Sequence, residues 1–227
     1  MAVDRVQVEP TADTDWSRWG GISGILFAVL FTMSLFLWNL PVGGGSSTDE
    51  VIRAYYADEG NRTRLVVATY VLAVAGLAFS LFLAALYSTL RVVESAPRFL
   101  SLVVLISGAV FVAMLMSAGA AIGALASGMS LGGEPATLGD TGVARFLGHM
   151  GYLFVLLYGA FAAIALMVAT SLVTLRTAVF PRWLAWAGFV AAVLLLAGII
   201  FLPMLAFPLW VLGASVRLMQ RRQAVPA

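Results

Sequence analysis

Four long apolar runs constrain the fold of this chain more than any other feature. They cover residues 22–40, 65–90, 99–126 and 152–175. A helix needs about 20 apolar residues to cross the hydrocarbon layer of a bilayer, and each run approaches or exceeds that length. Lipid leaves open backbone groups without partners, so a spanning segment satisfies them as a helix. The sequence therefore predicts the all-α class, as a polytopic transmembrane helical bundle.

The stretch 183–219 is also apolar, but it is too long for one span. As a single helix it would measure about 55 Å at about 1.5 Å per residue, and Pro203 and Pro208 interrupt it. We divide it into spans 183–202 and 204–218, which gives six spans in total. A five-span chain with a broken last helix is the alternative.

The predicted domain organisation follows from these spans. A six-helix transmembrane domain, 20–219, lies between an N-terminal tail, 1–19, and a C-terminal tail, 220–227. Its longer outer loops cover 42–64 and 127–148. The tail 1–19 carries more acidic than basic residues, unlike a cleavable signal peptide, so the first span is expected to stay in the membrane.

The composition agrees with a membrane protein and limits its chemistry. Hydrophobic residues make up 62% of the chain, charged residues 11%, and the mean hydropathy is +1.00. The lipid bilayer is thus the first predicted partner, and another membrane protein or a second copy of the chain is the other. A net charge of +2 is too small to indicate nucleic-acid binding. Cys is absent, which excludes disulfides and thiolate chemistry.

Arginine is distributed unequally between the two sides of the predicted bundle. Nine Arg fall on the side of the termini and four on the other side. The nine are Arg5, Arg18, Arg91, Arg98, Arg176, Arg182, Arg217, Arg221 and Arg222, and the four are Arg53, Arg62, Arg64 and Arg145. Cytoplasmic loops are enriched in Arg and Lys. We therefore expect the cytoplasmic membrane as the location, with both termini in the cytoplasm. The predicted headgroup anchors are Arg91, Arg98, Arg176, Arg182, Trp183, Arg217, Arg221 and Arg222.

One sequence pattern occurs twice. Thr89-Leu90-Arg91 followed by Pro97-Arg98 matches Thr174-Leu175-Arg176 followed by Pro181-Arg182. Small residues precede each copy and suit close helix packing; they are Gly76, Ser80, Ala84 and Ser88 in the first copy and Ala165 and Ala169 in the second. The pattern fits a recurring way to build an inward hairpin. It also fits a parallel repeat of spans two and three in spans four and five. A direct role for these Arg residues at an anionic lipid or partner is the third alternative.

The loop 42–64 predicts a short amphipathic helix over residues 48–59. Ser47 and Glu50 form a capping box, and Gly60 suits the residue that ends the helix. The expected apolar face consists of Val51, Ile52, Tyr55 and Tyr56. Such a helix lies on the outer membrane surface or covers the bundle. In the loop 127–148, Asp140 or Thr141 is expected to cap a helix that runs into span four.

Groups that carry chemistry do not converge in the sequence. Spans one to five contain no Asp, Glu, Lys, Arg or His between their ends, which lowers the expectation of ion-coupled transport. The candidate lining groups are Thr32, Ser34, Asn39, Tyr70, Ser107, Ser117, Tyr158, Thr170 and Ser171. Gly21-Ile22-Ser23-Gly24 matches an intramembrane serine protease motif, but His149, the single His, falls on the opposite side. No spacing around His149 indicates a metal site. We therefore predict no catalytic, cofactor or metal site.

The stretch Val179-Phe180-Pro181-Arg182-Trp183-Leu184, with Gly188 after it and Leu209-Trp210 before a basic tail, resembles one group of proteins. These are small six-helix bacterial integral membrane proteins of the actinobacterial type, of unknown function. The resemblance covers roughly residues 18–220 and implies a topology without an activity. The predicted function is that of a structural, accessory or assembly component and not an enzyme. An uncoupled facilitator, or a transport protein for lipid or a small apolar solute, is the alternative.

Overall fold

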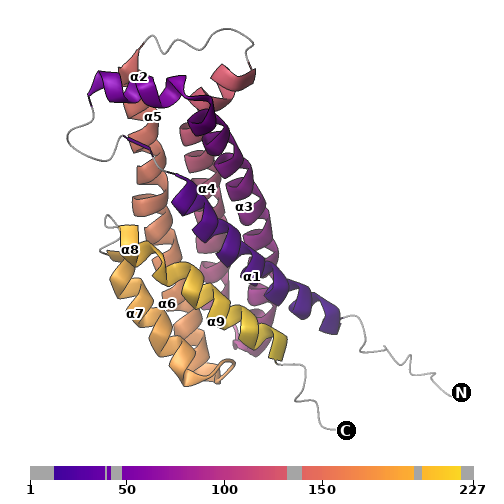
Figure 1. Ribbon diagram of the computed structural model, residues 1–227. Coiled ribbons are helices and arrows are strands. Elements are labelled where there is room, and N and C mark those ends of the chain that lie inside the picture. The colour runs from indigo at the N-terminus through magenta and orange to yellow at the C-terminus, as the bar shows by residue number, and fades with distance from the viewer. Residues whose placement is uncertain (1–12, 39, 42–47, 132–139, 197–200, 221–227) are drawn as a thin grey trace, which may run out of the picture.

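The structure is a computed structural model that describes residues 13–38, 40–41, 48–131, 140–196 and 201–220, and every regular element among them is a helix (Figure 1). The elements are α1 (Asp13–Leu37), α2 (Asp49–Ala57), α3 (Glu59–Val93), α4 (Phe99–Leu131), α5 (Thr141–Leu153), the π-helical turn η1 (Phe154–Gly159), α6 (Ala160–Thr177), α7 (Arg182–Leu196), α8 (Phe201–Met204) and α9 (Ala206–Gln220). The predicted all-α class is confirmed.

Four helices are long and apolar enough to cross a membrane. They are Trp16–Leu37, Glu59–Val93, Phe99–Ser130 and Thr141–Thr177, the last formed by α5, η1 and α6 together. Each contains one of the four predicted runs or most of it. The first begins earlier than predicted, because residues 13–19 of the predicted tail already belong to α1. Asp140 caps the fourth as expected: its side chain accepts a hydrogen bond from the Gly142 amide at 2.7 Å.

The last apolar stretch forms a hairpin of two shorter helices. α7 and α9 contain 15 residues each, about 22 Å of helix against about 30 Å of hydrocarbon. In Figure 1 the hairpin turns near α8, at about half the height of the bundle, and α9 returns to the end where α7 begins. Pro208 lies in the first turn of α9, where no amide hydrogen bond is lost. Neither the count of six spans nor the repeat follows from these lengths, since α4 has 33 residues and α7 has 15.

Aromatic rings fill the centre of the bundle. Six Phe side chains from four helices are buried in contact with one another, and we call them the ring cluster: Phe27 and Phe31 of α1, Phe79 and Phe82 of α3, Phe111 of α4 and Phe207 of α9. The Phe27 and Phe79 ring centroids are 4.7 Å apart, and those of Phe111 and Phe207 are 4.8 Å apart. Because α9 contributes Phe207, the hairpin is part of the core.

Close approaches between backbones surround the ring cluster. A Cβ on Gly20 would overlap the Ala85 side chain, so α1 and α3 cross tightly at this point. A Cβ on Gly24 would overlap the Ser215 hydroxyl, which joins α1 to α9 in the same way. The glycines around Ser23 therefore serve helix packing.

The predicted small-residue faces are placed differently from one another. Gly76 is buried against Met116, Ala169 is 3% exposed and Ala165 is half-buried. Ser80, Ala84 and Ser88 are exposed on the outside of the bundle, so they do not pack α3 against other helices of this chain. The inward face of α3 combines other small residues, such as Ala78 and Ala85, with the large rings of Phe79 and Phe82.

Candidate functional site

The helix α2 covers one end of the bundle, which we call the α2 end (Figure 1). Ile52 and Tyr56 are buried, Tyr55 is half-buried, and Val51 is 48% exposed, so the predicted apolar face holds except at Val51. Thr48 caps α2 by accepting a hydrogen bond from the Val51 amide. Gly60 does not end this helix, contrary to prediction, because α3 already begins at Glu59. Asp58 ends α2 and also caps α3 through the Asn61 amide, at 2.7 Å.

Charged side chains fasten α2 to its neighbours. Arg145 of α5 forms an ion pair with Asp49, with 2.9 Å between Nη2 and Oδ1. The hydrogen bond from Arg145 is the main reason why the pKa of Asp49 lies below its ordinary value. Arg62 donates to the carbonyls of Tyr56 at 2.7 Å and Ala57 at 2.8 Å. These bonds satisfy carbonyls that the end of a helix leaves open.

The buried phenol of Tyr56 and the side chain of Arg64 also belong to the contacts of the α2 end. Burial raises the pKa of Tyr56 to about 12, so the side chain stays neutral over the physiological range. Arg64 at the start of α3 donates to the Phe36 carbonyl near the end of α1, at 3.2 Å. The α2 end is thus a rigid surface in which the helix ends are capped.

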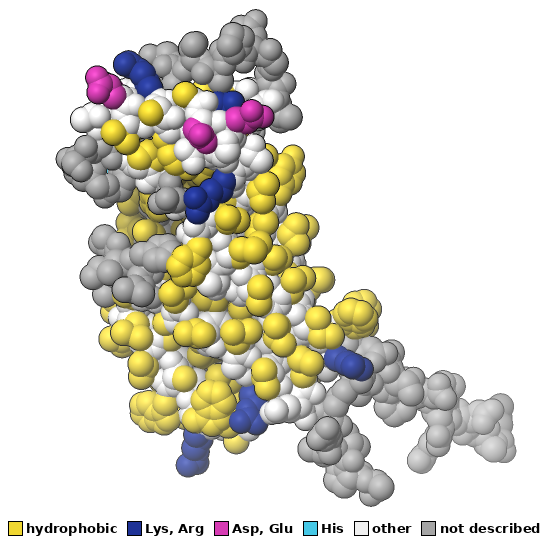
Figure 2. Space-filling view, viewed as in Figure 1, with side chains coloured by type: hydrophobic (Ala, Val, Ile, Leu, Met, Phe, Trp, Pro, Cys, Tyr) yellow, Lys and Arg dark blue, Asp and Glu magenta, His cyan; other side chains and the backbone are white. Residues whose placement is uncertain are grey.

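The opposite end, where α1 begins and α9 ends, is more basic, and we call it the basic end. Its described charged side chains are Arg18, Arg91, Arg98, Arg176, Arg182, Arg217 and Glu94. The α2 end carries Arg53, Arg62, Arg64 and Arg145 together with Asp49, Glu50, Asp58, Glu59 and Asp140. Figure 2 shows hydrophobic side chains over the side of the bundle and acidic side chains only at the α2 end in that view.

The first of the two similar turns, hairpin one, joins α3 to α4. Glu94 caps α4: its carboxylate accepts hydrogen bonds from the amides of Leu100 at 2.9 Å and Ser101 at 2.8 Å, and from the Ser101 hydroxyl. Burial raises the pKa of Glu94, but these bonds and the charge of Arg176 outweigh burial, so the pKa lies below its ordinary value. Arg98 has a positive φ of 58°.

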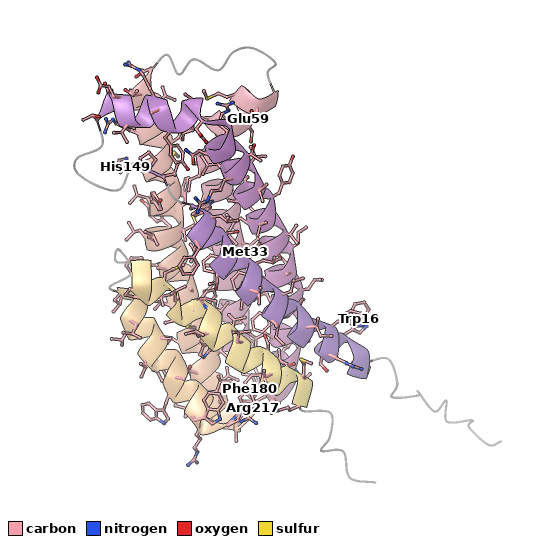
Figure 3. All side chains as sticks on the ribbon, in the orientation of Figure 1. Trp16, Met33, Glu59, His149, Phe180 and Arg217 are labelled. Atoms are coloured by element: carbon pink, nitrogen blue, oxygen red, sulfur yellow. The ribbon has the colours of Figure 1, made fainter. Side chains whose placement is uncertain are left out.

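The second turn, hairpin two, joins α6 to α7 and is built differently. Ala178 ends α6 with a φ of 53°, and its amide donates to the Thr174 carbonyl at 2.8 Å. Val179 and Phe180 are buried residues of this turn, and Figure 3 shows Phe180 at the basic end. The Arg217 guanidinium lies 5.5 Å from the centroid of the Trp183 ring.

Three cavities lie at or near the basic end. A cavity of about 790 Å³ lies between α1 and α3, and its lining comprises Trp16, Trp19, Gly20, Leu81, Ala84, Ala85 and Ser88. A cavity of about 290 Å³ is lined by Tyr87, Ser88, Arg91, Val92 and Arg98. A third, of about 890 Å³, lies between the two hairpins and includes Glu94, Phe99 and Arg176.

The predicted headgroup anchors all belong to the basic end where the structure describes them. Arg91, Arg98, Arg176, Arg182 and Trp183 are exposed, and Arg217 is half-buried. Arg221 and Arg222 lie outside the described residues, as does Asn39 among the candidate lining groups. Glu94 was not predicted as a cap, although an acidic residue shortly before a helix is a usual capping signal.

The polar side chains considered for catalysis or transport do not lie together in the fold. Ser23 donates to the Gly20 carbonyl at 2.9 Å. His149 is exposed near the α2 end (Figure 3), and its Nδ1 lies 2.8 Å from the Arg145 carbonyl of the same helix. Tyr70 and Tyr158 are exposed, whereas Ser34, Thr170 and Ser171 are buried on different helices or faces. Within the described ranges no three His, Cys, Asp or Glu side chains gather as a metal site would require.

The ring cluster was not predicted as a unit. Phe27 with Phe31, and Phe79 with Phe82, have the spacing of one helix face, which was the available signal.

Comparison with protein-family models, curated proteins and solved structures finds no match.

Proposed function

We propose that this chain is a structural, accessory or assembly component of a membrane, without an enzymatic site. The observation that carries the proposal is the ring cluster, whose side chains from α1, α3, α4 and α9 occupy the centre of the bundle. A solute path would have to run through this region. Packed rings leave no polar partners for a solute that sheds its water, so the ring cluster favours a rigid body over a conduit.

The α2 end is the surface that such a body would present to a partner. Its outward face carries Glu50, Val51 and Arg53, while Ile52 and Tyr56 hold it in place from below. A rigid surface loses little conformational entropy on binding. We therefore assign partner contact to this face and mechanical support to the bundle.

Flux measurements in proteoliposomes test the proposal against the facilitator alternative. We expect glycerol-driven swelling, followed by light scattering, to match that of protein-free liposomes. Phe111→Ala, which removes one ring of the cluster, should leave the rate unchanged. Flux above the protein-free rate that rises further in Phe111→Ala would contradict the proposal and favour a path through the bundle.

We further propose a topology with six membrane-entering segments and both termini in the cytoplasm. The proposal rests on Arg18, Arg91, Arg98, Arg176, Arg182 and Arg217, which share the basic end, against four Arg at the α2 end. It holds whether α7 and α9 cross fully or form a re-entrant hairpin, because both arrangements return the chain to the same side. A reporter fused after Arg222 should score cytoplasmic, and a periplasmic score would contradict this topology.

A further inference from the structure

The two smaller cavities of the basic end share one residue, Ser88. The cavity of about 790 Å³ has apolar and small lining residues from α1 and α3, and the cavity of about 290 Å³ has two Arg and one Tyr. An apolar cavity that continues into a cationic one has the chemistry of a lipid: acyl chain in the first, phosphate in the second. We propose that this pair of cavities is a binding site for an anionic phospholipid, and the proposal does not depend on the proposed function.

The shape of the apolar cavity follows from its residues. Trp16 and Trp19 are 72% and 63% exposed at the start of α1, and Figure 3 shows Trp16 projecting away from the bundle. Beside them, Gly20 packs directly on Ala85 without side-chain bulk. Large rings next to small residues leave a hollow between α1 and α3, and Trp residues at the ends of spans lie at the level of the lipid headgroups.

The length of the site matches one leaflet. Its lining on α3 runs from Leu81 through Ala84 and Ser88 to Arg91. From the first to the last of these residues the helix rises about 15 Å, at about 1.5 Å per residue. One leaflet contributes about half of the 30 Å hydrocarbon thickness. An acyl chain that lies along Leu81 and Ala84 therefore brings its phosphate to the level of Arg91.

The charges around the smaller cavity select an anion. Arg91 and Arg98 both line it and are exposed, and neither guanidinium group forms a hydrogen bond or ion pair within the part of the chain that the structure describes. Two guanidinium groups can hold a phosphate through several charge-assisted hydrogen bonds. The phenol of Tyr87 adds a further donor.

Arg176, which matches Arg91 in hairpin two, has a different environment. Its charge lowers the pKa of Glu94, the carboxylate of hairpin one. Arg176 lines the third cavity together with this carboxylate, which repels a phosphate. The pair Arg176 and Arg182 therefore provides a control in which the same charge is removed from the same end of the molecule.

Fluorescence quenching tests the site in the full chain. The protein is reconstituted in phosphatidylcholine vesicles that contain either phosphatidylglycerol or phosphatidylcholine with brominated acyl chains, which quench Trp fluorescence on contact. We expect stronger quenching by the brominated phosphatidylglycerol at equal mole fraction. Trp16→Phe with Trp19→Phe should remove that excess, because these rings line the acyl cavity.

Charge variants decide whether the preference belongs to this site. A basic residue near an anionic surface contributes about 1 kcal/mol, which is about fivefold in preference. Arg91→Gln with Arg98→Gln should therefore lower the preference for phosphatidylglycerol about tenfold or more, whereas Arg176→Gln with Arg182→Gln should change it less than about twofold. Equal losses in both pairs would reduce the effect to general surface charge and overturn the proposal, as would an unchanged preference in the first pair.

A steric pair tests the acyl cavity without changing charge. Ala84→Phe fills the cavity and should abolish the excess quenching, while Ala109→Phe, at an exposed position of α4 outside the lining, should not. Excess soluble glycerol phosphate should leave the lipid preference intact. If glycerol phosphate abolishes it, or if Ala84→Phe behaves like Ala109→Phe, the site does not take a lipid chain and the proposal fails.

Discussion

Hairpin one and hairpin two share a sequence pattern but have different structures. Their shared residues, Thr-Leu-Arg and Pro-Arg, end and begin helices in both, and the Arg side chains are exposed in both. What differs is the interior of the turn. In hairpin one the carboxylate of Glu94 holds the amides that begin α4. In hairpin two Val179 and Phe180 are buried residues of the turn.

The comparison separates two kinds of information in one motif. The repeated residues fit the membrane boundary, where exposed Arg side chains retain a loop on one side. The unrepeated residues decide the backbone, through a polar cap in hairpin one and apolar burial in hairpin two. A shared pattern at a membrane boundary therefore predicts where the chain turns but not how it turns.

The largest expected effect comes from removing the apolar anchor of hairpin two. Phe180 is 3% exposed, and Phe180→Ala should lower the free energy of unfolding by about 3 kcal/mol, since a buried ring leaves a cavity. Thermal unfolding in mild detergent measures the loss. Phe99→Ala in hairpin one is the control: its ring is 64% exposed, and a change below about 0.5 kcal/mol is expected. Equal losses would show that the two turns are held alike.

The polar anchor of hairpin one should contribute less. Glu94→Ala removes the cap of α4 and should lower the free energy of unfolding by about 1 kcal/mol, the usual value of a lost helix cap. The exposed neighbour Ser95 serves as control, and Ser95→Ala should have little effect. Amide exchange at Leu100 and Ser101 should rise in Glu94→Ala and stay unchanged in Phe180→Ala. Faster exchange at both sites in both variants would contradict separate anchors.

Acid should weaken hairpin one selectively. The pKa of Glu94 is lowered below its ordinary value of 4.5, so its contribution to stability is complete above pH 4.5 and is lost as the pH falls through the lower folded pKa. The stability difference between wild type and Glu94→Gln, measured by unfolding at a series of pH values, should therefore shrink on acidification. A difference that stays constant into strong acid would refute the capping role of the carboxylate.

The smallest effect concerns a backbone feature that both turns share. Ala178 and Arg98 have φ values of 53° and 58°, a region that glycine adopts without steric cost. Ala178→Gly removes the steric cost of this conformation but increases the conformational entropy of the unfolded chain. The net expectation is a rise in the free energy of unfolding of about 0.5 kcal/mol. Thr177→Gly, inside α6, should lower it instead. A destabilising Ala178→Gly would mean that the side chain at 178 matters more than the backbone.

Helices were predictable from the sequence wherever the apolar run was continuous. The run at 99–126 gives α4, and Asp140 gives the start of α5, because length and capping are local properties. The packing faces were harder to predict. Ser80, Ala84 and Ser88 have the spacing of a packing face but are exposed. In a bilayer the lipid and the protein interior are both apolar, so hydrophobicity does not indicate which face is buried.

The structure of the last apolar stretch, 183–219, could not be predicted from local sequence signals either. Pro203 and Pro208 were expected to mark the break, but α7 ends at Leu196, and Pro203 and Pro208 lie within α8 and α9. The packing of this hairpin also joins residues far apart in the chain. Trp210 illustrates this: it fits no headgroup position, yet it is 4% exposed and its Nε1 donates to the Leu184 carbonyl at 3.3 Å. The partner lies 26 positions earlier in the chain, where no sequence pattern links the two.

The contact between α1 and α9 has a consequence for the order of assembly. Gly24 meets Ser215, and Phe27 meets Phe207, so one face of α1 is completed only by the helix that follows all other described helices. During synthesis at the ribosome, α1 enters the bilayer long before α9 exists. Until then its Phe27 face lies against lipid or against an insertion factor. Release of α1 from that temporary neighbour must therefore wait until α9 has been synthesised, which makes closure of this bundle a late step relative to the insertion of its first helix.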